Sequence, residues 1–304
     1  MPTLNELIND KNKPLDDVPN RFRSQMLLVQ DDAYEQILVL LSKLDQDSQG
    51  NFILNKKNQS LLTEMDLLLK EIMNKTQYGE YVTELAKEFN VQMGRNDDYF
   101  KEAFPGFKPS EEAKFIVRQA QSNAVDLLIN TSLDSDFIHP VKESIELAVI
   151  NRAGYKETMD NLAELIKGGE DTTGKIEKYA GQIAHDTFAV ADRSYTSEIS
   201  EQYGAEWFYY SGAIIDTSRE FCIERHDKYY YYKEIEDWAK LDWAGKMKGT
   251  NEATIFSTAG GYWCGHSIMP VSIFSVPRFV IERNIKNGNF EPSEFEIKEL
   301  GLVA

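Results

Sequence analysis

Two cysteines and two histidines fall into two tight pairs in the last third of the chain. Cys222 and His226 are four residues apart, and Cys264 and His266 are two residues apart. On a helix the first spacing places both side chains on one face, and on an extended segment the second places both on one side. Zinc binds four nitrogen or sulfur ligands in a tetrahedron, so the two pairs predict a zinc site.

Two other interpretations of these four residues stay open. In the first, the cysteines are buried thiols and the histidines are solvated or hydrogen-bonded. In the second, the cysteines form a disulfide, which the expected reducing compartment disfavours. No open coordination position or neighbouring general base can be named, so a metal at this place is expected to be structural rather than catalytic.

A polar cluster at residues 216–220 lies directly before Cys222. Asp216 and Ser218 are residue types that cap turns and helix starts. Arg219 is suited to pairing with a nearby carboxylate, and the alternative is that it clamps a phosphate. The sequence has no phosphate-binding Gly-x-x-x-x-Gly-Lys-Ser/Thr loop, no dinucleotide fingerprint and no Gly-x-Ser-x-Gly elbow. No catalytic residue is assigned, and the chain is not expected to be an enzyme.

One enzymatic alternative remains, because the residue order loosely resembles that of ADP-ribosyltransferases. An arginine comes first, Arg193 or Arg219. The Ser-Thr pair at residues 257–258 follows, and then the Glu-x-Glu of Glu294 and Glu296. Such an ADP-ribosyltransferase-like or toxin-type enzyme requires both glutamates and an arginine to converge in one pocket.

The charge balance restricts the partners. The chain has 304 residues and a formal net charge of -17, and a surface of this kind repels phosphate, so strong nucleic-acid binding is not expected. No run of about 18 apolar residues exists, so no membrane span is expected. The first residues lack a charged region followed by an apolar one, so we expect no signal peptide. The cytosol is the expected place of folding.

Apolar residues recur at three- and four-residue steps through the first two thirds of the chain, which predicts amphipathic helices. A breaker separates two of them at residues 104–109, and a turn is predicted at residues 139–140. The predicted helical stretches are residues 34–44, 61–72, 81–89, 110–128, 141–153, 156–166 and 173–204.

After residue 204 the sequence becomes richer in aromatic and β-branched residues, which favour strands. Residues 207–210 and 213–215 are predicted to form a strand pair or one kinked strand. Further strands are predicted at residues 229–232, 253–257 and 267–274, and a short helix at residues 233–238. The predicted fold class is therefore α+β: a mainly helical body at residues 1–170, then a small α+β domain at residues 171–304 that a long helix introduces. The tail after residue 290 mixes charged and apolar residues and has no assigned role.

Eight blocks in the last third carry a familiar pattern: residues 184–195, 216–222, 228–230, 234–238, 243–246, 249–251, 254–256 and 260–271. They resemble the C-terminal part of tailed-phage minor head proteins, the head-morphogenesis family similar to the phage Mu protein F. Many members of that family have Cys-x-x-Cys in the first block and His…Cys-x-Cys in the second. Here His226 and His266 stand at two of those places, and the first spacing is longer.

The resemblance implies a structural virion protein of a tailed bacteriophage, made in the host cytoplasm and located inside the head near the portal. It implies a role in head assembly and in DNA packaging or ejection, with the portal protein, the major capsid protein or both as partners, and a few copies per virion. Residues 1–170 are expected to make the portal or capsid contact. A zinc-stabilised adaptor outside any virion is a further alternative.

Overall fold

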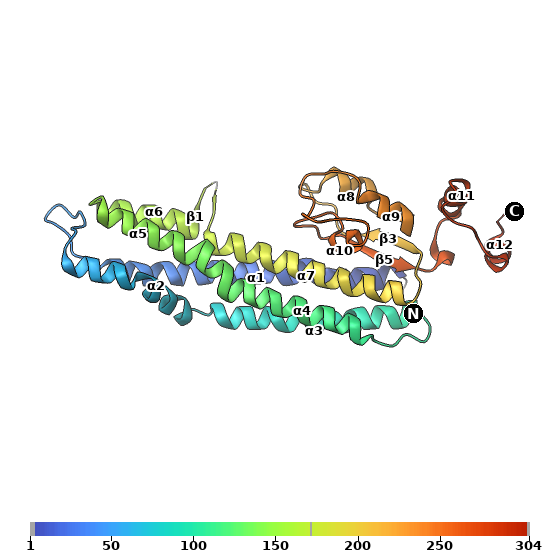
Figure 1. Ribbon diagram of the computed structural model, residues 1–304, viewed down its shortest axis with the longest axis horizontal. Helices are drawn as coiled ribbons and strands as arrows, with labels where there is room; N and C mark the ends of the chain where they lie inside the picture. Colours follow the sequence, from blue (N-terminus) through green and yellow to red (C-terminus); the bar gives the residue numbers. More distant parts are fainter. Residues whose placement is uncertain (1–3, 171, 303–304) are drawn as a thin grey trace. The chain divides into compact units, whose positions relative to one another are not determined.

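The computed structural model describes residues 4–170 and 172–302. It is 67% helical with small antiparallel sheets, which confirms the predicted α+β class. Long helices come first along the chain (Figure 1). They are α1 (Leu4–Leu41), α2 (Lys56–Lys75), α3 (Tyr78–Ala103), α4 (Glu111–Asp126), the π-helical η1 (Leu127–Thr131) and η2 (Leu133–Ile138), α5 (His139–Ile150), α6 (Tyr155–Lys167) and α7 (Lys175–Gln202).

A pair of two-residue strands, β1 (Gly168–Gly169) and β2 (Thr172–Thr173), lies between α6 and α7. Shorter elements follow α7. They are β3 (Trp207–Ser211), α8 (Glu220–Arg225), β4 (Lys228–Tyr231), α9 (Tyr232–Trp238), α10 (Ile255–Thr258), β5 (Ser267–Val271), η3 (Ile273–Ser275), α11 (Arg278–Lys286) and α12 (Glu294–Leu300).

The chain divides into two compact units. Unit 1 consists of Met1–Asp16, Phe89–Gln121 and Asp186–Ala304, and unit 2 of Asp17–Glu88 and Ser122–His185. Helices α1, α3, α4 and α7 contribute residues to both units. The predicted division into residues 1–170 and 171–304 states which parts of the chain fold independently. It stays a prediction.

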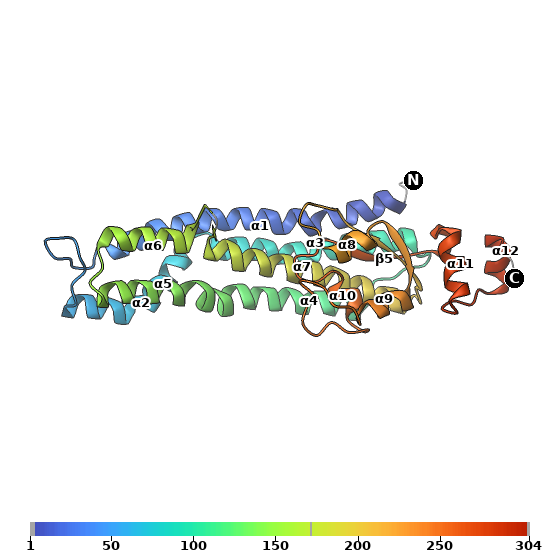
Figure 2. The same cartoon turned by 90° about the horizontal axis from the view of Figure 1, so that it is seen from above.

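Unit 2 is built from amphipathic helices, and α2, α5 and α6 lie side by side in it (Figure 2). In α6 the buried residues Thr158, Leu162 and Ile166 recur every four positions, which gives the helix one buried face. Gly168 ends this helix with a φ of 85°. A Cβ there would lie 2.2 Å from the Thr172 carbonyl oxygen, so only glycine fits.

The turn predicted at residues 139–140 is wrong. The chain continues as π-helical η2 directly into α5, with Pro140 in the first turn of that helix. Proline has no amide hydrogen to donate, and Pro140 lies where the hydrogen-bond ladder changes from π-helical to α-helical. The breaker at residues 104–109 and the capping role of Ser110 are both confirmed, since the Ala113 amide donates to the Ser110 hydroxyl at 3.2 Å.

A buried polar network stabilises the helical part of unit 1. The Lys11 ammonium contacts the Asp192 carboxylate at 2.8 Å, and both side chains are 1% exposed. Gln92 donates to the other carboxylate oxygen at 2.8 Å and to the Lys11 carbonyl at 3.0 Å. Burial lowers the pKa of Lys11, and the Asp192 carboxylate opposes that shift. The network joins α1, α3 and α7 through charges that have no access to water.

We expect Lys11→Met to destabilise the protein by about 3–5 kcal/mol, because it leaves the Asp192 carboxylate buried without its cation. The double variant with Asp192→Leu should recover most of this loss, since it removes both charges. Urea unfolding of the single and double variants measures the effect. Lys101→Met serves as control, because Lys101 pairs with Asp98 at the exposed surface and its loss should leave the midpoint unchanged. Equal stability of Lys11→Met and wild type would contradict the prediction.

Strands β3, β4 and β5 form an antiparallel sheet in the order β4-β3-β5. Successive residues of β3 point to opposite faces. Phe208 and Tyr210 enter one buried cluster with α8, α9 and α10, and Trp207 enters a second cluster with α11. Figure 1 shows α8 and α9 on one side of β3. The structure confirms, to within one residue at each end, the predicted strands at 207–210 and 229–232 and the predicted helix at 233–238. Residue 232 belongs to the helix and not to the strand.

Two predicted strands in this region are wrong. Residues 213–215 form no strand, because the chain turns there: the Ser218 amide donates to the Ile215 carbonyl, and the Ile215 amide to the Ser218 hydroxyl. Residues 253–257 enter helix α10 instead. Asn251 forms the turn just before that helix, since its side-chain oxygen accepts from the amides of Ala253 and Thr254. The strand predicted at 267–274 stops at Val271 and continues as a 3₁₀ turn.

The tail after residue 290 packs against the sheet. Ser293 and Glu296 form a reciprocal capping box that begins α12. Leu302 is 8% exposed and belongs to the same buried cluster as Trp207 and Phe290. The tail therefore completes the second core of the C-terminal region.

Candidate metal centre

Helix α8 carries the first cysteine. Phe221 and Cys222 are its buried residues, and the Arg225 guanidinium covers the Phe221 ring at 3.9 Å. The helix ends at Arg225, and His226 has a non-helical ψ of 138°. The main-chain amide of His226 still donates to the Cys222 carbonyl at 2.8 Å. The spacing of four residues therefore keeps the backbone of His226 bonded to that of Cys222, although His226 itself lies outside the helix.

The loop from residue 259 to residue 266 carries the second pair. Two of its residues other than glycine have positive φ values, Ala259 at 41° and Trp263 at 56°. Such backbone conformations cost energy and persist only where the surroundings hold them. Arg193 of α7, itself 2% exposed, donates to the carbonyl oxygens of Cys264 and His266. The buried Arg193 guanidinium thus holds the backbone of this loop in place.

Cys222, Cys264 and His266 converge. Their ligand atoms all lie within 4.8 Å of one another, and all three residues are buried. The two Sγ atoms are 3.9 Å apart, and Cys264 Sγ is 3.8 Å from His266 Nδ1. Two sulfurs on one tetrahedral zinc would be about 3.8 Å apart, and a sulfur and a nitrogen about 3.6 Å. The observed spacing therefore suits a tetrahedral ion, and the three residues can hold a metal.

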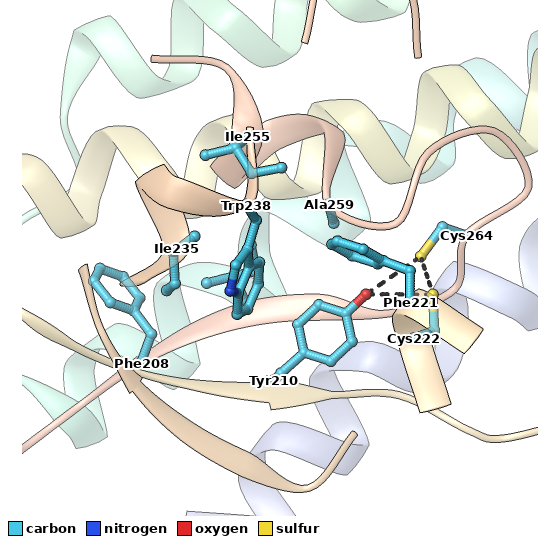
Figure 3. Close-up of a cluster of buried hydrophobic side chains, with 10 residues drawn as sticks. Phe208, Tyr210, Phe221, Cys222, Ile235, Trp238, Ile255, Ala259 and Cys264 are labelled. Carbon is cyan, nitrogen blue, oxygen red and sulfur yellow. Dashed lines mark hydrogen bonds between the residues drawn. The ribbon is translucent and has the colours of Figure 1, made fainter. Parts of the chain in front are cut away.

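Close packing surrounds these three residues. A Cβ on Gly260 would lie 2.5 Å from Cys222 Sγ and 2.6 Å from Cys264 Sγ. The Tyr210 ring stacks on the His266 ring with centroids 5.1 Å apart. Figure 3 shows the Tyr210 hydroxyl pointing at the two sulfurs, 3.5 Å from that of Cys222. The group is accordingly enclosed by the core of the sheet.

The two thiols influence each other. The two thiols share a hydrogen bond, and this bond lowers the pKa of Cys264, with His266 and Arg193 acting in the same direction. The same bond and burial raise the pKa of Cys222. A thiolate is the form that binds a metal. Both cysteines are free, so the disulfide interpretation does not describe this structure.

His226, the fourth predicted ligand, lies beside this group rather than within it. Its ring centroid is 5.8 Å from that of His266, and its Nε2 is 3.0 Å from the Asp227 carboxylate. The structure thus brings together Cys222, Cys264 and His266, with His226 adjacent. Sequence reasoning missed Tyr210 and Gly260, although the Gly-Gly pair just before Cys264 was a signal of close backbone approach.

The residues of the enzymatic alternative do not converge as it requires. Arg193 is buried and donates hydrogen bonds to carbonyl oxygens of the loop at residues 259–266. Arg219 donates to the Tyr262 carbonyl at 2.6 Å. Glu294 and Glu296 line a cavity of about 960 Å³ whose described lining includes Lys233 but no arginine. Glu296 is also occupied in the capping box of α12. This geometry gives the ADP-ribosyltransferase-like alternative no support.

Comparisons of the chain with protein-family models, with curated proteins and with solved structures gave no match. Within residues 4–170 and 172–302, the helices are all too short or too polar to cross a membrane.

Proposed function

We propose that this chain is a structural minor head protein of a tailed bacteriophage, located inside the head near the portal and acting in head assembly and in DNA packaging or ejection. The observation that carries the proposal is the buried convergence of Cys222, Cys264 and His266. Two of the resembling blocks, residues 216–222 and 260–271, supply those three residues. A cluster enclosed by core side chains suits a structural role better than turnover of a substrate.

The metal that we propose for this centre is zinc in a structural role. Two thiolates and an imidazole are a ligand set that zinc accepts at tetrahedral distances. Structural zinc sites are closed to solvent, and the three residues here are 2–4% exposed. Zinc would join α8 to the loop that precedes β5. The ligands from these two segments, Cys222 and Cys264, are 42 residues apart in sequence.

The proposed partners are the portal protein, the major capsid protein or both. The net charge of -17 supports a position beside packaged DNA, because a protein that repels phosphate does not impede DNA movement. It also suits contact with a basic protein surface.

The test is the composition of phage particles from cells that express the chain. We expect the full-length protein in purified DNA-filled heads, in a few copies per particle, and retained with portal protein after mild disruption. Deleting its gene should lower the yield of infectious particles. Its absence from particles produced by the same cells would overturn the proposal, and favour an adaptor that acts outside the virion.

A further inference from the structure

We infer that Asp227 is a positioning residue of the metal centre: its carboxylate orients His226 so that Nδ1 becomes the fourth metal ligand. The inference rests on the proposed zinc centre and extends it to a second layer of residues, Asp227 and Tyr209. It is carried by the positions of the two ring nitrogens of His226.

The two nitrogens of His226 face different surroundings. Nε2 is 3.0 Å from the Asp227 Oδ2 atom. Nδ1 is buried and, within the described residues, has no hydrogen-bond partner. A neutral imidazole carries its proton on the nitrogen that faces a carboxylate, so the lone pair resides on Nδ1. A buried lone pair with nothing to accept is costly unless a cation or donor meets it.

The position of the ring suits coordination beside His266. The two ring centroids are 5.8 Å apart, with the planes at 84°. Two imidazoles that share a tetrahedral zinc would have centroids roughly 5 Å apart. The two separations agree to within about 1 Å, so His226 lies beside the cluster of Cys222, Cys264 and His266. The ligand set would then be two sulfurs and two nitrogens.

Asp227 itself is held from two directions. Its main-chain amide donates to the Tyr210 carbonyl at 3.0 Å, and its Oδ1 accepts from the Tyr209 hydroxyl at 2.6 Å. Its φ is 55°, a conformation that aspartate tolerates better than most residues. Strand β3 therefore fixes the carboxylate, and the carboxylate fixes the imidazole. Metal-bound histidines commonly donate their second nitrogen to a carboxylate in this manner.

An ordinary surface ion pair is the competing explanation, because the Asp227 side chain is 62% exposed. Such a pair contributes little to stability and nothing to metal affinity. The two explanations differ in what a change at Asp227 does to metal binding, and that difference can be measured.

The experiment measures zinc affinity of the full-length protein by competition with a chromophoric chelator. Asp227→Asn should weaken zinc binding about 10- to 100-fold, and Tyr209→Phe should weaken it less. Glu224→Gln is the matched control, since Glu224 is an equally exposed carboxylate on α8 that pairs with Arg225 instead. It should leave the affinity unchanged. Circular dichroism confirms that each variant is folded.

X-ray absorption of the zinc-loaded protein supplies a second readout. We expect two sulfur and two nitrogen neighbours in the wild type, and the loss of one nitrogen in His226→Gln. If Asp227→Asn and Tyr209→Phe bind zinc as tightly as wild type, and His226→Gln keeps both nitrogens, the inference is overturned while the zinc proposal stands. If the wild type binds no zinc at all, the zinc proposal itself fails, and this inference with it.

Discussion

We expect a chelator to destabilise unit 1 strongly by removing the zinc that we propose for the Cys222, Cys264 and His266 centre. At a zinc concentration 1,000 times the dissociation constant, bound metal contributes about 4 kcal/mol to folding. For a body of 150–250 residues, this corresponds to a fall of about 8–16 °C in the melting temperature when a chelator removes the ion. Cys264→Ser should have the same low melting temperature without chelator, and its zinc content should fall below about 0.2 per chain. Differential scanning calorimetry with elemental analysis measures both quantities.

The Cys264→Ser variant also supplies the control for this prediction. A chelator that acts only by removing the ion should not lower its melting temperature further. The prediction is contradicted if wild-type protein as purified contains less than about 0.2 zinc per chain, or if chelator leaves its melting temperature unchanged. The second result would mean that packing around Cys222, Cys264 and His266 is sufficient without metal.

Local patterns predicted the helices and part of the sheet. The apolar steps at residues 61–72 and 156–166 fall inside α2 and α6, because a buried helix face needs that periodicity. The failures have local causes too. Residues 253–257 resemble a strand by composition, but the Asn251 side chain holds the amides of Ala253 and Thr254 in a turn, and the chain continues from that turn into α10.

The candidate centre was predictable in its ligand types but not in its geometry. Spacing alone marked Cys222 with His226 and Cys264 with His266. It did not show that α8 ends at Arg225, so that His226 lies outside the helix with a ψ of 138°. Contacts between distant residues were not visible either. Arg193 resembled a catalytic arginine, yet it binds the carbonyl oxygens of a loop more than 70 residues later.

Replacing Gly260 by alanine tests whether the two sulfurs must stay at their present separation. The added Cβ would lie 2.5 and 2.6 Å from them and 3.2 Å from the Tyr210 hydroxyl. Both sulfurs would have to move apart or the loop would have to retreat, and either change spoils a tetrahedral site. We expect a stability loss of about 1–3 kcal/mol in the metal-free protein, and a fall of at least about 100-fold in zinc affinity.

Gly94→Ala separates this effect from the general effect of adding a methyl group. Gly94 is exposed on α3, and a Cβ there meets nothing within 4 Å. Alanine should therefore raise stability by about 0.5–1 kcal/mol, because it favours the helix. Urea unfolding without metal and chelator competition with metal give the two numbers for each variant. A Gly260→Ala protein that binds zinc as tightly as wild type would show that the sulfurs do not hold the ion, since no tetrahedron tolerates a methyl group between its two sulfur ligands.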